Sequence, residues 1–341
     1  MRSVVIDAPG SVRVDTRPDP GLPGPDGAVI AVTATAICGS DLHFYDGEYP
    51  LIEPVAVGHE AIGTVVDVGP QVQSVGIGDR VMVSSVAGCG HCEGCATLDP
   101  IRCHSGPLIF GCGVLGGAQS ELLAVPGADF QLARIPDAIT DAEALLLTDN
   151  LATGWAAALR ADIPAGGTVA VIGLGAVGLC AARSALLLRA ATVVGVDPVR
   201  ERRERAALSG VCPVEPPTLS AAMELTGGRG VDAVIDAVGS DTTMNDALQA
   251  VRPGGTVSVV GVHNLKPFPF PALGALVRSI TLRMTTAPVQ QTWPQLIPLL
   301  QAGRLSVDGI FTTELPLAAA AQAYRAAAAR SGEVVKVLLT P

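Results

Sequence analysis

Four cysteines gather in one short glycine-rich stretch with the spacing C-x-x-C-x-x-C-x7-C. They are Cys89, Cys92, Cys95 and Cys103, half of the eight cysteines in the chain. One loop that carries four thiolates at this spacing can surround a single tetrahedral Zn²⁺. Such a site is closed, because no coordination position is left for a substrate. We therefore expect this lobe to hold a structural zinc rather than to perform chemistry.

A second group of metal-binding residue types is scattered along the chain: Cys38, His43, His59, Glu60 and Asp149. A thiolate, an imidazole and a carboxylate supply three protein ligands and leave a fourth position open, which is typical of catalytic zinc. Each residue alone also has a plain structural interpretation. Cys38 could be a small buried hydrophobe, His59 a core histidine, and Asp149 the cap of the following helix. A nearby dinucleotide motif favours the catalytic interpretation.

That motif is a G-x-G-x-x-G pattern at Gly173, Gly175 and Gly178, placed between an expected strand and an expected helix. The glycines permit a tight turn, close approach of a pyrophosphate, and packing of the helix on the strand. The helix N-terminus then offers free N–H groups to the phosphates. Asp197 lies 19 residues after Gly178, where a carboxylate can bind both ribose hydroxyls and repel a 2′-phosphate. This favours NAD over NADP, although the arginines that follow, Arg200, Arg202 and Arg203, could accommodate the extra phosphate.

The elements that position these residues fall into two patterns. The first 150 residues are rich in Val, Gly and Pro, and predict an irregular β-rich domain with strands at 1–6, 29–34 and 63–68. Later, strands alternate with helices, which predicts a doubly wound parallel α/β sheet. We expect its strands at 168–172, 192–196, 231–235, 256–260 and 280–284, and helices at 152–159 and 176–188. A helix at 293–301 and a strand at 333–339 are expected to return to the first domain.

Length, charge and apolar segments limit the possible function classes. A chain of 341 residues is long enough for two domains, and its net charge of −10 argues against a nucleic-acid partner. The N-terminus lacks a signal-peptide pattern, and the most apolar region, 168–196, is interrupted by Arg183 and Arg189 and is no membrane span. We therefore expect a cytoplasmic protein with reduced cysteines, so that metal sites are favoured over disulfides.

One longer motif connects these features. The pattern G-H-E-x2-G-x5-G-x2-V occupies residues 58–72, and Gly-Asp-Arg-Val follows at 78–81. With the cysteine lobe and the glycine motif in the same order, essentially the whole chain resembles the zinc-dependent alcohol dehydrogenases of the medium-chain dehydrogenase/reductase superfamily. The resemblance implies a GroES-like catalytic domain at 1–149 and 287–341, with the structural zinc lobe at about 88–104. It also implies a Rossmann NAD-binding domain at 150–286, and a homodimer or homotetramer.

The resemblance further implies roles for single residues. Cys38, His59 and Asp149 would hold the catalytic zinc, with Glu60 behind the metal as an exchangeable ligand. Ser40 and His43 align with the proton relay. Some of the expected cofactor contacts are Asp197 and the glycine fingerprint, which is the motif of Gly173, Gly175 and Gly178. The others are Thr153, Val177, Arg202, Val262 and Lys336, with Lys336 near the pyrophosphate.

These observations predict a zinc-dependent oxidoreductase that transfers a hydride between a primary or secondary alcohol and NAD, reversibly giving an aldehyde or ketone. Zinc would lower the pKa of the alcohol, Ser40 and His43 would carry its proton to solvent, and the hydride would pass to the nicotinamide. On the same fold, a formaldehyde or other aldehyde dehydrogenase and a polyol or threonine dehydrogenase remain alternatives. A zinc-ribbon binding protein is a remote alternative that the acidic charge disfavours.

Overall fold

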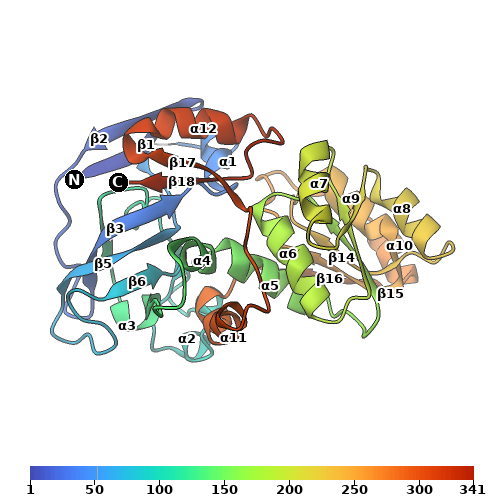
Figure 1. Ribbon diagram of the computed structural model, residues 1–341, viewed down its shortest axis with the longest axis horizontal. Helices are drawn as coiled ribbons and strands as arrows, with labels where there is room; N and C mark the ends of the chain where they lie inside the picture. The colour runs from blue at the N-terminus through green and yellow to red at the C-terminus, as the bar shows by residue number, and fades with distance from the viewer. Residues whose placement is uncertain (52) are drawn as a thin grey trace. The chain divides into compact units, whose positions relative to one another are not determined.

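The computed structural model describes residues 1–51 and 53–341, and Figure 1 shows the path of the chain. Two compact units can be distinguished. The first comprises Met1–Ala152, Pro288–Gly303 and Phe311–Pro341; the second comprises Thr153–Ala287 and Arg304–Ile310. Each unit has a sheet and a buried core of its own.

The first unit is built on mostly antiparallel sheets. Its main sheet has the strand order β10-β6-β5-β3-β18-β17, and β9 also pairs with β3; β2-β1-β4 and β7-β8 form two smaller sheets. The strands are β1 (Arg2–Ala8), β2 (Ser11–Thr16), β3 (Ala28–Ala36), β4 (Val55–Ala56), β5 (Ala61–Val68), β6 (Arg80–Val83), β7 (Val86–Ala87), β8 (Leu108–Ile109), β9 (Leu122–Val125), β10 (Leu132–Arg134), β17 (Phe311–Pro316) and β18 (Lys336–Thr340).

Short helices connect these strands. They are α1 (Asp41–Tyr45), α2 (Glu93–Ala96), the 3₁₀ turn η1 (Pro100–Arg102), α3 (Ala128–Gln131), α4 (Asp141–Leu147), α11 (Val289–Gln301), the 3₁₀ turn η2 (Leu317–Ala319) and α12 (Ala320–Ala328). Helix α5 (Asn150–Arg160) begins in the first unit and continues into the second. The C-terminal helix α12 lies beside β1 and β2, so both ends of the chain belong to the same unit (Figure 1).

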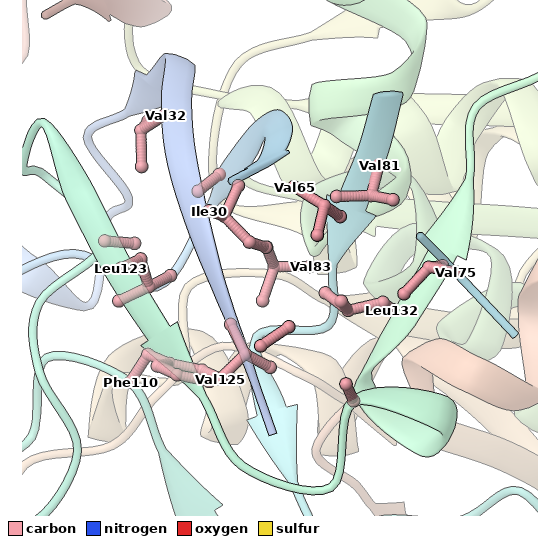
Figure 2. Close-up of a cluster of buried hydrophobic side chains, with 14 of the residues drawn as sticks. Ile30, Val32, Val65, Val75, Val81, Val83, Phe110, Leu123, Val125 and Leu132 are labelled. Carbon is pink, nitrogen blue, oxygen red and sulfur yellow. The ribbon is translucent and has the colours of Figure 1, made fainter. Parts of the chain in front are cut away.

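The core of the first unit lies between β3, β5, β6 and β9, and Figure 2 shows its side chains converging. Alternate residues of each strand point inward because successive side chains of a strand face opposite sides. Ile30 of β3, Val65 of β5 and Leu123 of β9 are almost completely buried. This packing fixes β3 against β5 in an antiparallel register that pairs Thr35 with Ala61. The end of β3 and the start of β5 therefore lie together.

The second unit contains a six-stranded parallel sheet with the order β13-β12-β11-β14-β15-β16. Its strands are β11 (Thr168–Ile172), β12 (Thr192–Val196), β13 (Cys212–Val214), β14 (Val231–Asp236), β15 (Val251–Val259) and β16 (Thr281–Met284). The connecting helices are α6 (Ala176–Leu187), α7 (Arg200–Ala207), α8 (Thr218–Leu225), α9 (Asp241–Ala250) and α10 (Ala272–Val277). The central strands are continuous apolar runs because both faces of the sheet are buried.

The predicted fold class is confirmed: a GroES-like β domain accompanies a Rossmann-like parallel sheet. The strands expected at 168–172 and 192–196 have the predicted bounds. Other elements differ at their ends. Strand β15 begins at Val251 instead of 256, with an irregular register near its start, and β18 begins at Lys336 instead of 333. Helix α11 starts at Val289, four residues before the prediction, although it contains two prolines.

No helix in residues 1–51 and 53–341 is long and apolar enough to span a membrane. This agrees with the expectation for the apolar region 168–196, which forms two strands of the parallel sheet and the helix between them.

Candidate metal centres and cofactor site

Four of the five scattered metal-binding residue types meet in the first unit, largely because of the register between β3 and β5. Cys38 follows β3 by two residues, and His59 and Glu60 immediately precede β5. Asp149 lies between α4 and α5. One ligand atom from each of these four residues lies within 4.8 Å of every other, which is the mutual proximity that a single metal ion requires.

These four residues, Cys38, His59, Glu60 and Asp149, form a small polar site that we call the cradle. Asp149 Oδ2 lies 3.4 Å from Cys38 Sγ and 3.7 Å from His59 Nε2. Glu60 Oε2 is buried and has no hydrogen-bond partner among the residues that the structure describes. A buried carboxylate oxygen without a partner is costly, so its presence beside three potential ligands fits a cation. The donor set of sulfur, nitrogen and carboxylate oxygen matches the ligands that Zn²⁺ takes.

The electrostatics of the cradle also favour a cation. Burial lowers the pKa of His59, but the Asp41 carboxylate and the neighbouring Cys38 sulfur outweigh this effect and raise that pKa well above its usual value. Burial raises the pKa of Asp149, but a hydrogen bond with His59 and the electrostatic attraction of the His59 ring lower that pKa to about 2. Burial also raises the pKa of the Cys38 thiol, and the neighbouring Asp149 carboxylate raises it further. The surroundings thus stabilise positive charge, as a bound metal ion would supply.

Two residues that the sequence did not single out hold the cradle. Asp41 is 3% exposed and places Oδ1 3.4 Å from His59 Nδ1, while its Oδ2 accepts the backbone N–H of Cys38 at 2.9 Å. Asn150 directs Nδ2 to Asp149 Oδ2 at 2.8 Å and to Glu60 Oε1 at 3.3 Å. A carboxylate that engages the second nitrogen of a metal-binding histidine fixes its tautomer and ring orientation. Their sequence positions offered a signal, because Asp41 is the third residue after Cys38 and Asn150 directly follows Asp149.

Ser40 and His43, the expected proton relay, lie on either side of the start of α1. Ser40 Oγ is 3.4 Å from His59 Nε2, which places the hydroxyl beside the cradle. His43 Nδ1 lies 2.5 Å from Glu48 Oε2, and its ring stacks on Tyr49 with 5.0 Å between centroids. The structure thus brings Ser40 to the metal-binding residues, whereas His43 pairs with a half-exposed carboxylate.

Lys336 has partners within the protein that the sequence did not predict. Its Nζ is buried, lies 2.7 Å from Glu60 Oε1 and donates to the Ile37 carbonyl at 3.2 Å. It therefore neutralises Glu60 behind the metal-binding residues. Its expected contact with the cofactor pyrophosphate stays a prediction.

The four cysteines of the lobe also converge, and all of them are free thiols. Cys89 Sγ and Cys95 Sγ are 3.9 Å apart, and a tetrahedral Zn²⁺ with Zn–S bonds of about 2.3 Å would separate its sulfurs by about 3.8 Å. Backbone N–H groups of Cys95 and His104 point at Cys92 Sγ and lower the pKa of that thiol to about 6. Hydrogen bonds of this kind stabilise thiolate. The lobe therefore fits a closed zinc site, and the cradle fits an open one.

The glycine fingerprint occupies the expected turn between β11 and α6 in the second unit. A Cβ at Gly178 would lie 1.7 Å from the Gly173 carbonyl oxygen, so only glycine lets α6 approach the strand. A Cβ at Gly175 would meet no described atom within 4 Å, which leaves open space above the helix N-terminus. Asp197 accepts the N–H of Leu174 at 2.8 Å and that of Val199 at 2.8 Å. Asp197 thus connects the end of β12 to the fingerprint loop.

The other expected cofactor contacts are distributed over the second unit. Thr153 is buried in α5, and Val177 is half-buried in the first turn of α6. Arg202 places a guanidinium nitrogen 3.8 Å from Asp197 Oδ2. Val262, which follows β15, is 42% exposed. The unit therefore brings Arg202 together with Asp197 at the fingerprint.

Comparisons with known proteins agree with this geometry. The family model of the alcohol dehydrogenase GroES-like domain matches residues 24–137, and that of the zinc-binding dehydrogenase matches residues 176–302. A Mycobacterium tuberculosis protein named "Probable zinc-binding alcohol dehydrogenase" is 69% identical over 100% of this chain and 89% of its own length.

Solved structures with the same fold include a dehydrogenase and two cofactor complexes. The alcohol dehydrogenase of Thermus sp. ATN1 has a TM-score of 0.92 and 35% identity, covering 100% of this chain and 99% of that one. An alcohol dehydrogenase from E. coli CFT073 in complex with NADH has a TM-score of 0.88 and 25% identity, covering 100% and 99%. A zinc-binding dehydrogenase from Sinorhizobium meliloti 1021 bound to NADP has a TM-score of 0.85 and 28% identity, covering 100% and 99%.

The relatives match the chain across both units, and the residues that they would need for metal binding are brought together in the first. The chain belongs to the zinc-dependent alcohol dehydrogenases of the medium-chain dehydrogenase/reductase superfamily.

Proposed function

We propose that the chain interconverts an alcohol and its aldehyde or ketone with NAD as hydride acceptor or donor, at a zinc held by Cys38, His59 and Asp149. The observation that carries this proposal is the convergence within 4.8 Å of four ligand atoms, one each from Cys38, His59, Glu60 and Asp149. The buried Glu60 Oε2, which has no hydrogen-bond partner among the described residues, supports it. Three ligands leave a coordination position for a substrate, and a bound zinc supplies Lewis acidity there that lowers the pKa of an alcohol.

The protein side chains have defined tasks in this reaction. Asp41 orients His59 through Nδ1, and Asn150 holds the Asp149 carboxylate in place. Ser40, beside His59, receives the proton that the alcohol loses, and His43 passes it towards solvent. Glu60 and Lys336 keep the charge behind the metal balanced.

NAD is proposed in preference to NADP because of the partners of the arginines near Asp197. Arg203 donates to the carbonyls of Asp197 and Pro198 and pairs with Glu215 at 2.6 Å. Arg200 pairs with Glu204 at 2.7 Å. These two guanidinium groups are engaged, and the Asp197 carboxylate disfavours a 2′-phosphate. An Asp197→Ser variant is expected to have a higher KM for NAD and a smaller preference for NAD over NADP. A ratio of the KM for NADP to the KM for NAD that equals the wild-type ratio would contradict this assignment.

We also propose a homodimer or homotetramer, because an apolar face on the second unit is unpartnered within the described chain. Leu273, Leu276 and Val277 of α10 are 74%, 75% and 76% exposed, and the neighbouring β16 is an edge strand. An exposed apolar patch next to a free strand edge is typical of a surface that pairs with another copy. Light scattering of the wild type and of Leu276→Glu would test this. The particles of the variant should have a lower molar mass in solution, because fewer chains associate.

Metal analysis and kinetics test the main proposal. The wild type should contain two zinc ions per chain and turn over alcohols with NAD. Cys38→Ala or Asp149→Ala should lose one zinc and nearly all turnover while remaining folded. Cys212→Ala, which removes an exposed cysteine outside both sets, is the matched control and should behave as wild type. Wild-type turnover in Cys38→Ala would rule out the assignment. An alcohol and aldehyde substrate panel separates alcohol oxidation from aldehyde oxidation.

A further inference from the structure

A buried chain of polar contacts connects the C-terminal helix with His59. The Tyr324 hydroxyl, on α12, donates to Gln119 Oε1 at 3.0 Å. Gln119 Nε2 in turn lies 3.2 Å from Asp41 Oδ2, and Asp41 Oδ1 lies 3.4 Å from His59 Nδ1. Tyr324 and Gln119 are completely buried, and Asp41 is 3% exposed. These side chains are far apart in sequence but form one path inside the first unit.

The chemistry of the partners fixes the direction of each hydrogen bond. Gln119 Nε2 also reaches the Ala36 carbonyl at 3.2 Å. That carbonyl and the Asp41 carboxylate only accept, so the amide must turn its NH₂ group towards them and its oxygen towards Tyr324. Burial raises the pKa of Tyr324 well above its usual value, so the phenol stays a donor. Tyr324 therefore stabilises the one amide orientation that donates to Asp41.

Residue Gln119 is also held beside the segment that leads to His59. Its backbone N–H donates to the Val57 carbonyl at 3.1 Å, and its carbonyl accepts the N–H of Val4 at 2.8 Å. A Cβ at Gly58, where φ is +95°, would lie 2.5 Å from Gln119 Cγ. The glycine before His59 therefore provides the space that the Gln119 side chain fills.

We propose that Tyr324 and Gln119 are positioning residues for the catalytic metal: they orient Asp41, which holds His59 so that Nε2 is presented to zinc. The inference rests on the proposed function of the cradle. A histidine whose Nδ1–H is held by a carboxylate has a fixed tautomer and ring plane, and partners of this kind change metal affinity by about 10- to 100-fold. In this chain the carboxylate is itself oriented by an amide and a phenol from two other parts of the unit.

The test follows zinc release from the holoenzyme to an excess of chelator, together with kcat and KM. Gln119→Met removes the donor to Asp41 with little change of volume, and should speed loss of the catalytic zinc about 10-fold or more. Tyr324→Phe removes one hydrogen bond and should speed it about fivefold. The four-cysteine zinc is an internal reference that should leave at the wild-type rate. Tyr45→Phe, whose ring packs on Tyr324 with centroids 5.6 Å apart, is the control.

A double-mutant cycle separates positioning from general stability. If Tyr324 acts through Asp41, Tyr324→Phe should have much less effect on zinc release in an Asp41→Asn background than in the wild type. Equal effects in both backgrounds, or equal zinc release from wild type and Gln119→Met, would overturn the inference. If the wild type carries zinc only in the four-cysteine lobe, the proposed function itself fails, which is a distinct outcome.

Discussion

Lys336 Nζ lies 2.7 Å from Glu60 Oε1, and both side chains are buried behind the metal-binding residues. Burial alone would raise the pKa of Glu60, and the positive charge of Lys336 lowers it. Burial alone would lower the pKa of Lys336, and the negative charge of Glu60 raises it. The pair is contributed by β18 near the C-terminus and by the residue just before β5. The C-terminal strand therefore completes the charge balance of a site whose ligands lie in the first half of the chain.

Lys336→Met should destabilise the protein, because it leaves Glu60 buried without its counter-charge and close to Asp149. Removing one partner of a buried ion pair costs about 3–5 kcal/mol. Lys336→Met/Glu60→Gln should recover part of this loss, since no uncompensated charge remains. Urea unfolding of the single and double variants measures the difference, with Lys266→Met as an exposed-lysine control. A double variant as unstable as the single one would contradict this account of the pair.

Two fingerprint glycines should respond differently to alanine. Gly178→Ala places a Cβ 1.7 Å from the Gly173 carbonyl oxygen and must push α6 away from β11, so the second unit should lose stability. Gly175→Ala meets no described atom within 4 Å, so the protein should fold normally. The added methyl group would instead occupy space that the pyrophosphate needs. Thermal melting and NADH binding by fluorescence check both effects: Gly175→Ala should bind NADH at least about 10-fold more weakly at an unchanged Tm.

The cysteine lobe should be necessary for stability but not for the chemical step. Cys92→Ser should lose the lobe zinc and lower the Tm, while the fraction that remains folded keeps its turnover per catalytic zinc. Gly94→Ala tests the same lobe without touching a ligand, because its Cβ would lie 1.9 Å from the Arg102 carbonyl oxygen. Gly116→Ala, with its nearest neighbour 4.0 Å away, is the control. Loss of turnover per catalytic zinc in Cys92→Ser would give the lobe a direct catalytic role.

The parallel sheet could be predicted well because its central strands are continuous apolar runs between helices. Thr168–Ile172 and Thr192–Val196 have the predicted bounds for this reason. The edge strand Cys212–Val214 was not predicted: it has three residues, one of them proline, and two are exposed. A short edge strand buries too little to leave an apolar pattern in the sequence.

The candidate metal ligands could be proposed from the sequence because their types are chemically distinctive, and the cysteine lobe also because its spacing is local. Their supporting residues were not. Tyr324 and Gln119 are 205 positions apart, and Lys336 and Glu60 are 276 apart. No sequence pattern around a tyrosine in a helix or a lysine in a strand identifies its distant partner. These contacts follow from the register of β3, β5 and β18 and the packing of α12, which only the folded chain defines.

Acid should remove a specific contribution of Asp232 to stability. Its carboxylate accepts the N–H of Thr168 at 2.9 Å and pairs with Arg252 Nε at 2.7 Å, so it connects the starts of β11, β14 and β15. Burial raises the pKa of Asp232, but the hydrogen bonds from Arg252 and the Thr168 N–H outweigh it and leave that pKa below its usual value. A carboxylate whose pKa is lowered on folding stabilises the protein above its unfolded pKa of about 3.9, and this contribution is lost as the pH falls through the folded pKa.

Asp232→Asn should therefore lower the free energy of unfolding by about 1.5–3 kcal/mol at pH 7, the usual worth of hydrogen bonds to a charged group. The difference from wild type should persist at pH 5 and shrink below about pH 4, where the carboxyl of the unfolded wild-type chain begins to take up its proton and the folded carboxyl follows at lower pH. Urea unfolding at pH 7, 5 and 3.5 measures it. Asp162→Asn, which breaks the exposed 3.5 Å pair with Arg283, is the matched control and should change stability by less than about 1 kcal/mol at every pH. A difference for Asp232→Asn that stays the same down to pH 3.5 would show that its effect comes from shape rather than from charge.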